Sequence, residues 1–383
     1  MKYFERHKLR EAAERIAASN QLAADRFSPM RFPTTLGEAF SNKAILVTGG
    51  TGSIGREIVR QVLQHSPRVV RVLSRNEYNQ YLMHKEYGER PDLRFLIGDV
   101  RDRERLMRAC EDVQVLIHAA ALKHVAICEY NPFEAVKTNV IGSQNLVECA
   151  LDYNMELLVG ISTDKAVSPT NTMGATKLLA ERVILTASQY KGDRRTRFAV
   201  IRFGNVLASR GSALPLFIRQ IASGGPVTLT HPEMRRFFMS IPQAVELALK
   251  ATLLARGGEI FILKMPVMRI ADLIEALIRI YAPRYGHDPA RIKVEQIGLL
   301  PGEKLYEALM TPEEALHSTE AVDHFKVEPL LPAPPELIAH PPAGYDSASQ
   351  PLLSPEEIVA MIEGHGLVEV FAEAVAEMPN GER

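Results

Sequence analysis

Tryptophan is absent from this chain of 383 residues, and cysteine occurs only three times. Cys110, Cys128 and Cys149 lack the close pairwise spacing of a metal site, so we expect no metal and interpret them as small buried apolar residues. Scarce cysteine and the lack of a recognisable signal peptide favour a cytoplasmic protein. Because no run of 18 apolar residues occurs, we predict no membrane-spanning helix.

A strong net charge is also lacking. The 45 Lys and Arg residues nearly balance the 46 Asp and Glu residues, for a net charge of −1. This balance gives no electrostatic reason to expect a nucleic-acid partner or an anionic membrane surface. The content of 46% hydrophobic and 24% charged residues is that of a soluble globular protein.

Short apolar runs alternate with segments of helical periodicity between residues 43 and 205. We expect strands at 44–48, 69–73, 94–97, 114–118, 157–161 and 198–203, and helices at 53–65, 76–87, 102–111, 133–153 and 173–190. This alternation predicts an α/β protein with a Rossmann-type doubly wound parallel sheet. Ligands of such folds bind beyond the carboxyl ends of the strands, so residues that follow the strands are the functional candidates.

A glycine turn follows the first of these strands. Gly49, Gly52 and Gly55 lie between the apolar run 44–47 and a helical pattern. Glycines let the backbone approach a pyrophosphate, and the helix N-terminus adds free N–H groups and a partial positive charge. The sequence therefore predicts a dinucleotide site, with contacts from Gly49, Thr51, Gly52, Ser53, Ile54 and Gly55.

The second strand ends where NAD-binding folds usually carry an acidic residue that holds the ribose 2′-hydroxyl. Ser74 and Arg75 occupy this position. A guanidinium can pair with a 2′-phosphate, so we predict NADP, and NAD remains the alternative if Arg75 only stacks on adenine. Further predicted cofactor contacts are Asn76, Asp99, Val100, Ala119, Ala120, Ala121, Lys123, Asn139, Ser162 and Lys177.

Four regions are expected along the chain. Residues 1–40 read as an N-terminal helical arm, either a packing arm or a subunit contact, and 41–205, with returning segments near 240–265, as the NAD(P)-binding domain. Residues 206–320 are expected to form a smaller mixed α/β substrate lobe, with a strand at 259–263 that returns to the main sheet. The proline-rich residues 321–383 are expected to be a surface wrap that ends in a helix near 355–363.

The segments 162–165 and 173–177 resemble the catalytic region of the extended short-chain dehydrogenase/reductase superfamily. In that superfamily a Tyr-x-x-x-Lys pair lies on the helix after this strand; the lysine holds the nicotinamide ribose and activates the tyrosine, which takes the substrate hydroxyl proton. Lys177 matches the lysine, but Met173 stands in the place of the tyrosine. A thioether cannot exchange a proton.

Seven strings in a common order narrow the resemblance to the polysaccharide-biosynthesis branch, the nucleotide-sugar 4,6-dehydratases acting on UDP-N-acetylglucosamine. That branch also has members, many of them membrane-anchored, with methionine at this position. The strings cover roughly residues 43–315: Thr48–Gly55, Gly98–Asp102, Ala120–Val125, Ser162–Ala166, Arg202–Val206, Ser209–Ser212 and Pro301–Leu305.

The resemblance implies roles for the remaining candidates. Asp164 is expected to be the acid at sugar O6 and Lys165 the base at C5, and burial together with nearby Lys177 is expected to lower the Lys165 pKa. The acceptor of the C4 hydroxyl proton stays open between Asp164, Thr163 and a water relayed to Lys177. Expected substrate contacts are Lys123, His124, Asn205, Arg210, Gly211, Ser212, Arg235, Arg236, Glu303 and Lys304.

The sequence therefore predicts an NAD(P)-dependent UDP-N-acetylglucosamine 4,6-dehydratase that works as a homo-oligomer. Hydride leaves C4, water is lost across C5 and C6, and the hydride returns to C6. A UDP-sugar 4-epimerase is an alternative, although it needs no acid–base pair at C5 and C6. A non-catalytic sensor of dinucleotide or nucleotide sugar is another, and Met173 is its main support. Retention or inversion at C5 stays open.

Overall fold

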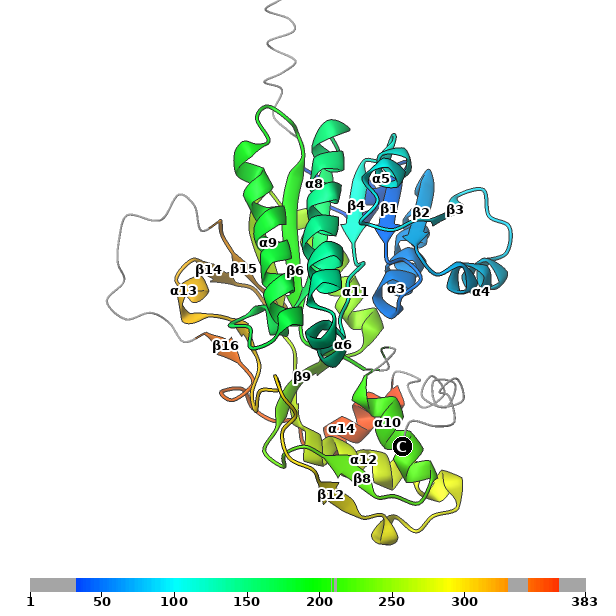
Figure 1. The fold of residues 1–383 in the computed structure, drawn as a ribbon, viewed down its shortest axis with the longest axis vertical. Helices are drawn as coiled ribbons and strands as arrows, with labels where there is room; N and C mark the ends of the chain where they lie inside the picture. Colours follow the sequence, from blue (N-terminus) through cyan, green and yellow to red (C-terminus); the bar gives the residue numbers. More distant parts are fainter. Residues whose placement is uncertain (1–31, 208, 210–211, 330–343, 365–383) are drawn as a thin grey trace, which may run out of the picture.

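The computed structural model describes residues 32–207, 209, 212–329 and 344–364. A nine-stranded sheet with the order β14-β15-β10-β6-β5-β4-β1-β2-β3 forms its larger part (Figure 1). The parallel strands are β1 (Ala44–Thr48), β2 (Val69–Ser74), β3 (Leu93–Ile97), β4 (Val115–His118), β5 (Leu157–Thr163), β6 (Arg197–Phe203) and β10 (Glu259–Leu263). This confirms the predicted α/β class and doubly wound sheet.

Helices cover both faces of this sheet (Figure 1). One layer contains α5 (Arg103–Cys110), α8 (Gly142–Asp152) and α9 (Thr172–Tyr190); the other contains α2 (Leu36–Phe40), α3 (Ser53–Val62) and α11 (Ile241–Leu254). Every residue of β1 and β6 is buried as a result. Central strands covered on both faces read as continuous apolar runs, which is why the sequence pattern located them.

Local capping explains where the helices of the site begin. The Asn171 side chain accepts a hydrogen bond from the Gly174 N–H and starts α9, and Ser240 and Gln243 form a capping box at α11. The helix α4 (Glu77–Tyr87) starts at the Asn76 cap. The predicted helix at 133–153 is divided into α7 (Pro132–Ala135), a π-helical turn (Val136–Ile141) and α8.

A smaller lobe lies beyond the carboxyl edge of the sheet and has its own hydrophobic core (Figure 1). Its helices are α10 (Ala213–Ala222), α12 (Ile270–Tyr281) and α14 (Pro355–Gly364). Its short strands are β7 (Asn205–Val206), β8 (Val227–Leu229), β9 (Arg235–Met239), β11 (Val267–Arg269) and β12 (Val294–Gln296). α14 packs against α12, so the end of the described chain belongs to this lobe.

The region after 320 differs from the expected surface wrap. In this region β15 (His324–Val327) pairs antiparallel with β10 and extends the main sheet. β14 (Ser318–Glu320), at the end of the segment expected to be the substrate lobe, pairs with β15 and also belongs to this sheet. Without β15, β10 would be an edge strand with unpaired backbone N–H and C=O groups. These groups pair with β15, a contact that the proline content of the segment could not predict. The helix predicted near 355–363 is α14. Residues 1–31 of the predicted arm lie outside the described residues.

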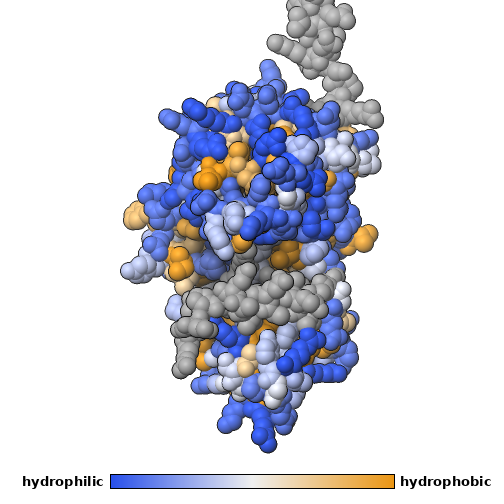
Figure 2. Space-filling view, turned by 90° about the vertical axis from the view of Figure 1, so that its right-hand side faces the viewer, coloured by the Kyte–Doolittle hydropathy of each residue, from blue (hydrophilic) through white to orange (hydrophobic). Residues whose placement is uncertain are grey.

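The surface in Figure 2 is mainly hydrophilic, with apolar residues in small groups. No helix within the described ranges is long and apolar enough to cross a bilayer.

Candidate active site

A cleft with a volume of about 1360 Å³ lies between the carboxyl edge of the sheet and the smaller lobe. The glycine turn forms one wall. Gly49 has φ +66°, and a Cβ at Gly55 would lie 2.2 Å from the Gly49 carbonyl oxygen. Only glycine allows the α3 N-terminus to come this close to the turn, as a pyrophosphate cradle requires. These residues therefore fit a dinucleotide.

The residues after β2 and β3 continue this wall. Arg75 is half exposed on the cleft, and its guanidinium lies 3.7 Å from Asp99. Burial opposes ionisation of Asp99, but hydrogen bonds from Arg101 outweigh it and lower the Asp99 pKa. Ser74 is buried and receives hydrogen bonds from Gln80. Asp99 thus stays an anion on the wall that Arg75 also lines.

All predicted cofactor contacts but one line the cleft. The exception is Asn139, which is buried behind the wall. Its amide binds the Leu122 N–H and carbonyl at 2.8 and 3.0 Å and the Thr176 hydroxyl at 3.0 Å. Asn139 therefore shapes the loop after β4 and is not brought to the cleft, because its polar groups are already used within the protein.

Lys177 reaches the cleft from α9, and its Nζ donates a hydrogen bond to the Ile161 carbonyl at 2.6 Å. Burial lowers the Lys177 pKa to about 8, although Glu181 opposes the shift. Met173, one turn earlier, is buried with Cys128 and Ala135 and also lines the cleft. The structure thus brings together the two positions of the resembled pair, with no proton-exchanging group at the first.

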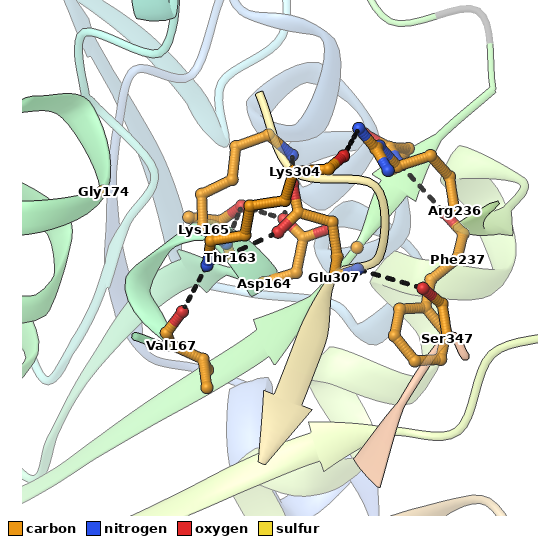
Figure 3. A network of polar contacts seen from close by, with 12 residues as sticks. Thr163, Asp164, Lys165, Val167, Gly174, Arg236, Phe237, Lys304, Glu307 and Ser347 are labelled. Atoms are coloured by element: carbon orange, nitrogen blue, oxygen red, sulfur yellow. Dashed lines mark hydrogen bonds and ion pairs between the residues drawn. The ribbon is translucent and has the colours of Figure 1, made fainter. Parts of the chain in front are cut away.

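Three consecutive residues at the end of β5 bring a hydroxyl, a carboxylate and an ammonium together. The Thr163 hydroxyl donates to Asp164 Oδ1 at 2.8 Å, and Lys165 Nζ donates to the same oxygen at 3.0 Å (Figure 3). β5 extends through Thr163, two residues past its predicted end. Asp164 has no exposed surface, whereas Thr163 and Lys165 line the cleft. At rest the Asp164 carboxylate therefore contacts the cleft only through its two neighbours.

Close backbone packing holds this group in place. A Cβ at Gly174 would lie 2.2 Å from the Lys165 carbonyl oxygen, so the glycine lets the start of α9 press against the Asp164–Lys165 turn. This close contact explains why glycine follows Met173 in the sequence.

The expectation of a lowered Lys165 pKa is wrong. Burial does act in that direction, but the negative charges of Asp164 and Glu307 outweigh it and raise the Lys165 pKa above that of a free lysine. Lys177 is not among the groups that perturb it. These two carboxylates therefore favour the protonated ammonium form of Lys165.

Glu307 is the functional candidate that sequence reasoning missed. It precedes β13 (Ala308–Met310), lines the cleft and is buried. Its Oε1 lies 3.8 Å from Lys165 Nζ, and its Oε2 lies 3.9 Å from Lys304 Nζ. In the sequence, Glu307 could have been suspected only because it lies two residues after the family-like string Pro301–Leu305.

Eight of the ten predicted substrate contacts lie in the part of the chain that the structure describes, and they divide into two groups. Those on the cleft are Lys123, His124, Asn205, Ser212, Arg236 and Glu303. Burial lowers the pKa values of Lys123 and His124, and Lys123 also lowers that of His124.

Arg235 and Lys304 do not line the cleft. The Arg235 guanidinium donates to the Ala348 carbonyl, and Lys304 Nζ donates to the carbonyls of Val167 and Ser168 at 2.9 and 2.7 Å. These hydrogen bonds connect neighbouring loops. The structure therefore does not bring Arg235 or Lys304 into a position to contact a ligand in the cleft. Arg210 and Gly211 lie outside the described residues.

A buried ion network fastens the sheet to the helix layer behind the site. Arg202 on β6 bonds Glu181 of α9 and Glu314 of α13 (Pro312–Ala315) at 2.7–2.9 Å. Burial opposes the charge, but the two carboxylates raise the Arg202 pKa. Glu181 lies one turn after Lys177, so this network also positions the helix that carries the lysine.

Fold and cleft together define a doubly wound α/β protein with a dinucleotide cradle and a second-lobe ligand site. A family model described as polysaccharide biosynthesis protein matches residues 45–329. The chain belongs to this family, a branch of the extended short-chain dehydrogenase/reductases, as the sequence predicted.

Relatives in this family carry different names. An uncharacterized membrane protein of Methanocaldococcus jannaschii is 59% identical over 290 residues, which are 76% of this chain and 87% of that protein. A UDP-N-acetylglucosamine 4,6-dehydratase (inverting) of Campylobacter jejuni is 39% identical over 294 residues, covering 76% and 84%. A UDP-glucose 4-epimerase of Rickettsia canadensis is 38% identical over 292 residues, covering 75% and 83%.

Solved structures agree on the fold. Pen from Bacillus thuringiensis has a TM-score of 0.80 and 45% identity, covering 86% of this chain and 99% of that one. DesIV from Streptomyces venezuelae, a dTDP-glucose 4,6-dehydratase solved with NAD and TYD, has a TM-score of 0.60 and 24% identity, covering 68% and 86%.

Proposed function

We propose that the protein is a UDP-N-acetylglucosamine 4,6-dehydratase. The observation that carries this proposal is the Thr163–Asp164–Lys165 group on the cleft wall beside a dinucleotide cradle. Elimination of water needs an acid and a base side by side, and this group supplies a carboxyl and an amine. The relative from C. jejuni that bears this name supports the choice of sugar nucleotide.

The cofactor in this proposal is a nicotinamide dinucleotide held by the glycine turn and Lys177. When bound, it would accept a hydride from sugar C4 and return it to C6. We propose NADP, because Arg75 presents a half-exposed guanidinium on the cleft where a 2′-phosphate would be recognised. NAD is the alternative, since DesIV, which shares the fold, was solved with NAD. Residues 206–320 would hold the nucleotide sugar, with Arg236 as a candidate ligand, and Asn205, just before this range, is a second candidate.

The missing tyrosine leaves the C4 hydroxyl proton without its usual acceptor. In our proposal this proton passes to the Thr163 hydroxyl, which gives its own proton to Asp164 through the 2.8 Å hydrogen bond. Asp164 then returns a proton by the same route to O6 as the C6–O bond breaks. The relay suits a carboxylate that has no exposed surface of its own.

A UDP-sugar 4-epimerase is the second candidate, because a relative at 38% identity carries an epimerase name. Oxidation at C4 is common to both reactions. The Asp164–Lys165 pair disfavours the epimerase, since return of hydride to C4 needs no group at C5 or C6.

One reaction separates these functions. The purified protein is incubated in heavy water with UDP-N-acetylglucosamine and either NAD or NADP, and the products are followed by mass spectrometry and NMR. A dehydratase gives a product that has lost one water and carries deuterium at C5, and the NMR couplings report the C5 configuration. An epimerase product keeps the substrate mass. Ligand-induced stabilisation without turnover would refute both and leave the sensor.

A further inference from the structure

Two carboxylates hold the ammonium of Lys165. Its Nζ lies 3.0 Å from Asp164 Oδ1 and 3.8 Å from Glu307 Oε1 (Figure 3). Asp164 is its neighbour in sequence, whereas Glu307 comes from the segment that enters β13. Only the tertiary structure makes this second contact.

The backbone aims the Glu307 carboxyl at the site. The Glu307 N–H donates to Ser347 Oγ at 3.0 Å, and its carbonyl accepts from the Ser347 N–H at 2.8 Å. The side chain is 4% exposed, and within the described residues its Oε2 accepts no hydrogen bond. Buried carboxyl oxygens normally accept hydrogen bonds, whereas this one has Lys304 Nζ at 3.9 Å, beyond hydrogen-bond distance, so the Glu307 carboxyl keeps the capacity to take up a proton.

The proposed reaction requires such a group. Lys165 is an ammonium at rest and must lose a proton before it can remove the C5 proton of a sugar. Asp164 cannot accept that proton while it holds the one that arrives from C4 through Thr163. Glu307 Oε1 is slightly beyond hydrogen-bond distance, a gap that a small side-chain rotation closes.

We propose that Glu307 is a positioning residue that holds Lys165 toward the cleft and takes up its proton, so that the amine becomes the base at C5. This inference rests on the proposed dehydratase function.

The proton count closes over one turnover. Lys165 gives a proton to the Glu307 carboxylate and becomes a neutral amine. The C5–H bond breaks, the proton goes to Lys165, and the electron pair left on C5 forms the double bond as the C6–O bond breaks. The leaving oxygen takes the Asp164 proton, through Thr163, and departs as water. As the hydride returns to C6, C5 takes up a proton, either the one that Lys165 carries or a solvent proton that has exchanged with it on the amine. Glu307 then returns its proton to Lys165.

The surrounding charges suit a carboxyl that gains and loses a proton. Burial and the negative charge of Asp164 raise the Glu307 pKa, while Lys165, Arg236 and Lys304 act against the shift. Arg236 donates its guanidinium hydrogen bonds to the carbonyls of Arg235, Lys304 and Leu305, and it acts on Glu307 through its charge. Glu307 is therefore a better proton acceptor than an exposed glutamate.

The test compares the wild-type protein with Glu307→Gln, Glu307→Asp and the control Glu313→Gln, which changes an exposed glutamate of α13. Each variant is assayed for water loss from UDP-N-acetylglucosamine with bound cofactor between pH 5.5 and 10. Thermal melting with and without cofactor verifies folding. C5-deuterated substrate shows whether proton removal limits the rate.

We expect Glu307→Gln to lower kcat at least about 100-fold, the usual contribution of a proton acceptor, with KM within about threefold. The wild-type rate should fall as the pH drops through the raised Glu307 pKa, whereas the variant rate should rise with pH until Lys165 loses its proton to solvent. The isotope effect at C5 should increase. Glu313→Gln should match the wild type.

A Glu307→Gln variant with wild-type kcat and an unchanged pH profile would overturn the inference while the dehydratase function stands. A wild-type protein that releases no dehydrated product would instead remove the function itself. If Glu307→Gln does not fold, Glu307→Asp decides, because its shorter carboxyl should lower kcat at least about tenfold at unchanged KM. Wild-type kcat in that variant would equally refute the inference.

Discussion

His118 should make the fold sensitive to mild acid. It ends β4, is buried, and lies between two hydroxyls: Thr48 Oγ1 is 2.7 Å from Nδ1 and Ser143 Oγ is 3.1 Å from Nε2. Ser143 donates its own proton to the Asn139 carbonyl at 2.6 Å, so it must accept from the His118 Nε2–H. Nδ1 then accepts from Thr48, and the neutral imidazole is fully satisfied. Burial, with a smaller contribution from Lys177, lowers the His118 pKa from 6.5 to about 3.

The sign and size of the effect follow from this shift. Below pH 6.5 His118 becomes protonated in the unfolded chain, whereas in the folded protein it stays neutral down to about pH 3. Stability is therefore lost as the pH falls through this window, and the loss between pH 7 and pH 5 amounts to about 2 kcal/mol of unfolding free energy.

The assay is urea unfolding at both pH values. Glutamine at position 118 keeps a donor and an acceptor but does not titrate, so His118→Gln should reduce the loss between pH 7 and pH 5 by about 2 kcal/mol, whatever its constant effect on stability. Replacing the exposed His84 by glutamine serves as the matched control and should leave the loss unchanged. Equal losses in the wild type and His118→Gln would refute the assigned hydrogen-bond pattern.

Two further predictions concern the relay and the ion network. Thr163→Val removes the hydroxyl that joins the cleft to Asp164 and should lower kcat at least about 100-fold, whereas Thr163→Ser should stay within about tenfold of the wild type, as measured by water loss; a fast valine variant would contradict the relay. Arg202→Met leaves two buried glutamates without their cation and should cost about 3–5 kcal/mol in urea unfolding at pH 7. Lys250→Met, at a half-exposed pair, should cost less than about 1 kcal/mol, and similar losses in the two variants would contradict the assigned burial.

Local sequence signals located most of the main sheet. Its inner strands are covered on both faces and therefore appear in the sequence as apolar runs. The turn from Gly49 to Gly55 could be recognised because its close backbone contacts require glycine. The same logic placed Thr163, Asp164 and Lys165 together, since neighbours at the end of a parallel strand share one edge of the sheet.

What the sequence could not determine depends on contacts between distant segments. Glu307 meets Lys165 only because the strand pair β13–β16 (Tyr345–Asp346) carries it back to the end of β5, and its charge adds to that of Asp164 in raising the Lys165 pKa against the expected direction. Asn139, Arg235 and Lys304 looked like ligands, but each donates a side-chain hydrogen bond to a backbone carbonyl of another segment, and none of the three lines the cleft. Likewise, β15 joins the sheet because β10 offers an open edge. Residue types and short spacings thus determined the chemistry available, whereas the charge state and partner of each group were decided by which distant segments came to lie beside it.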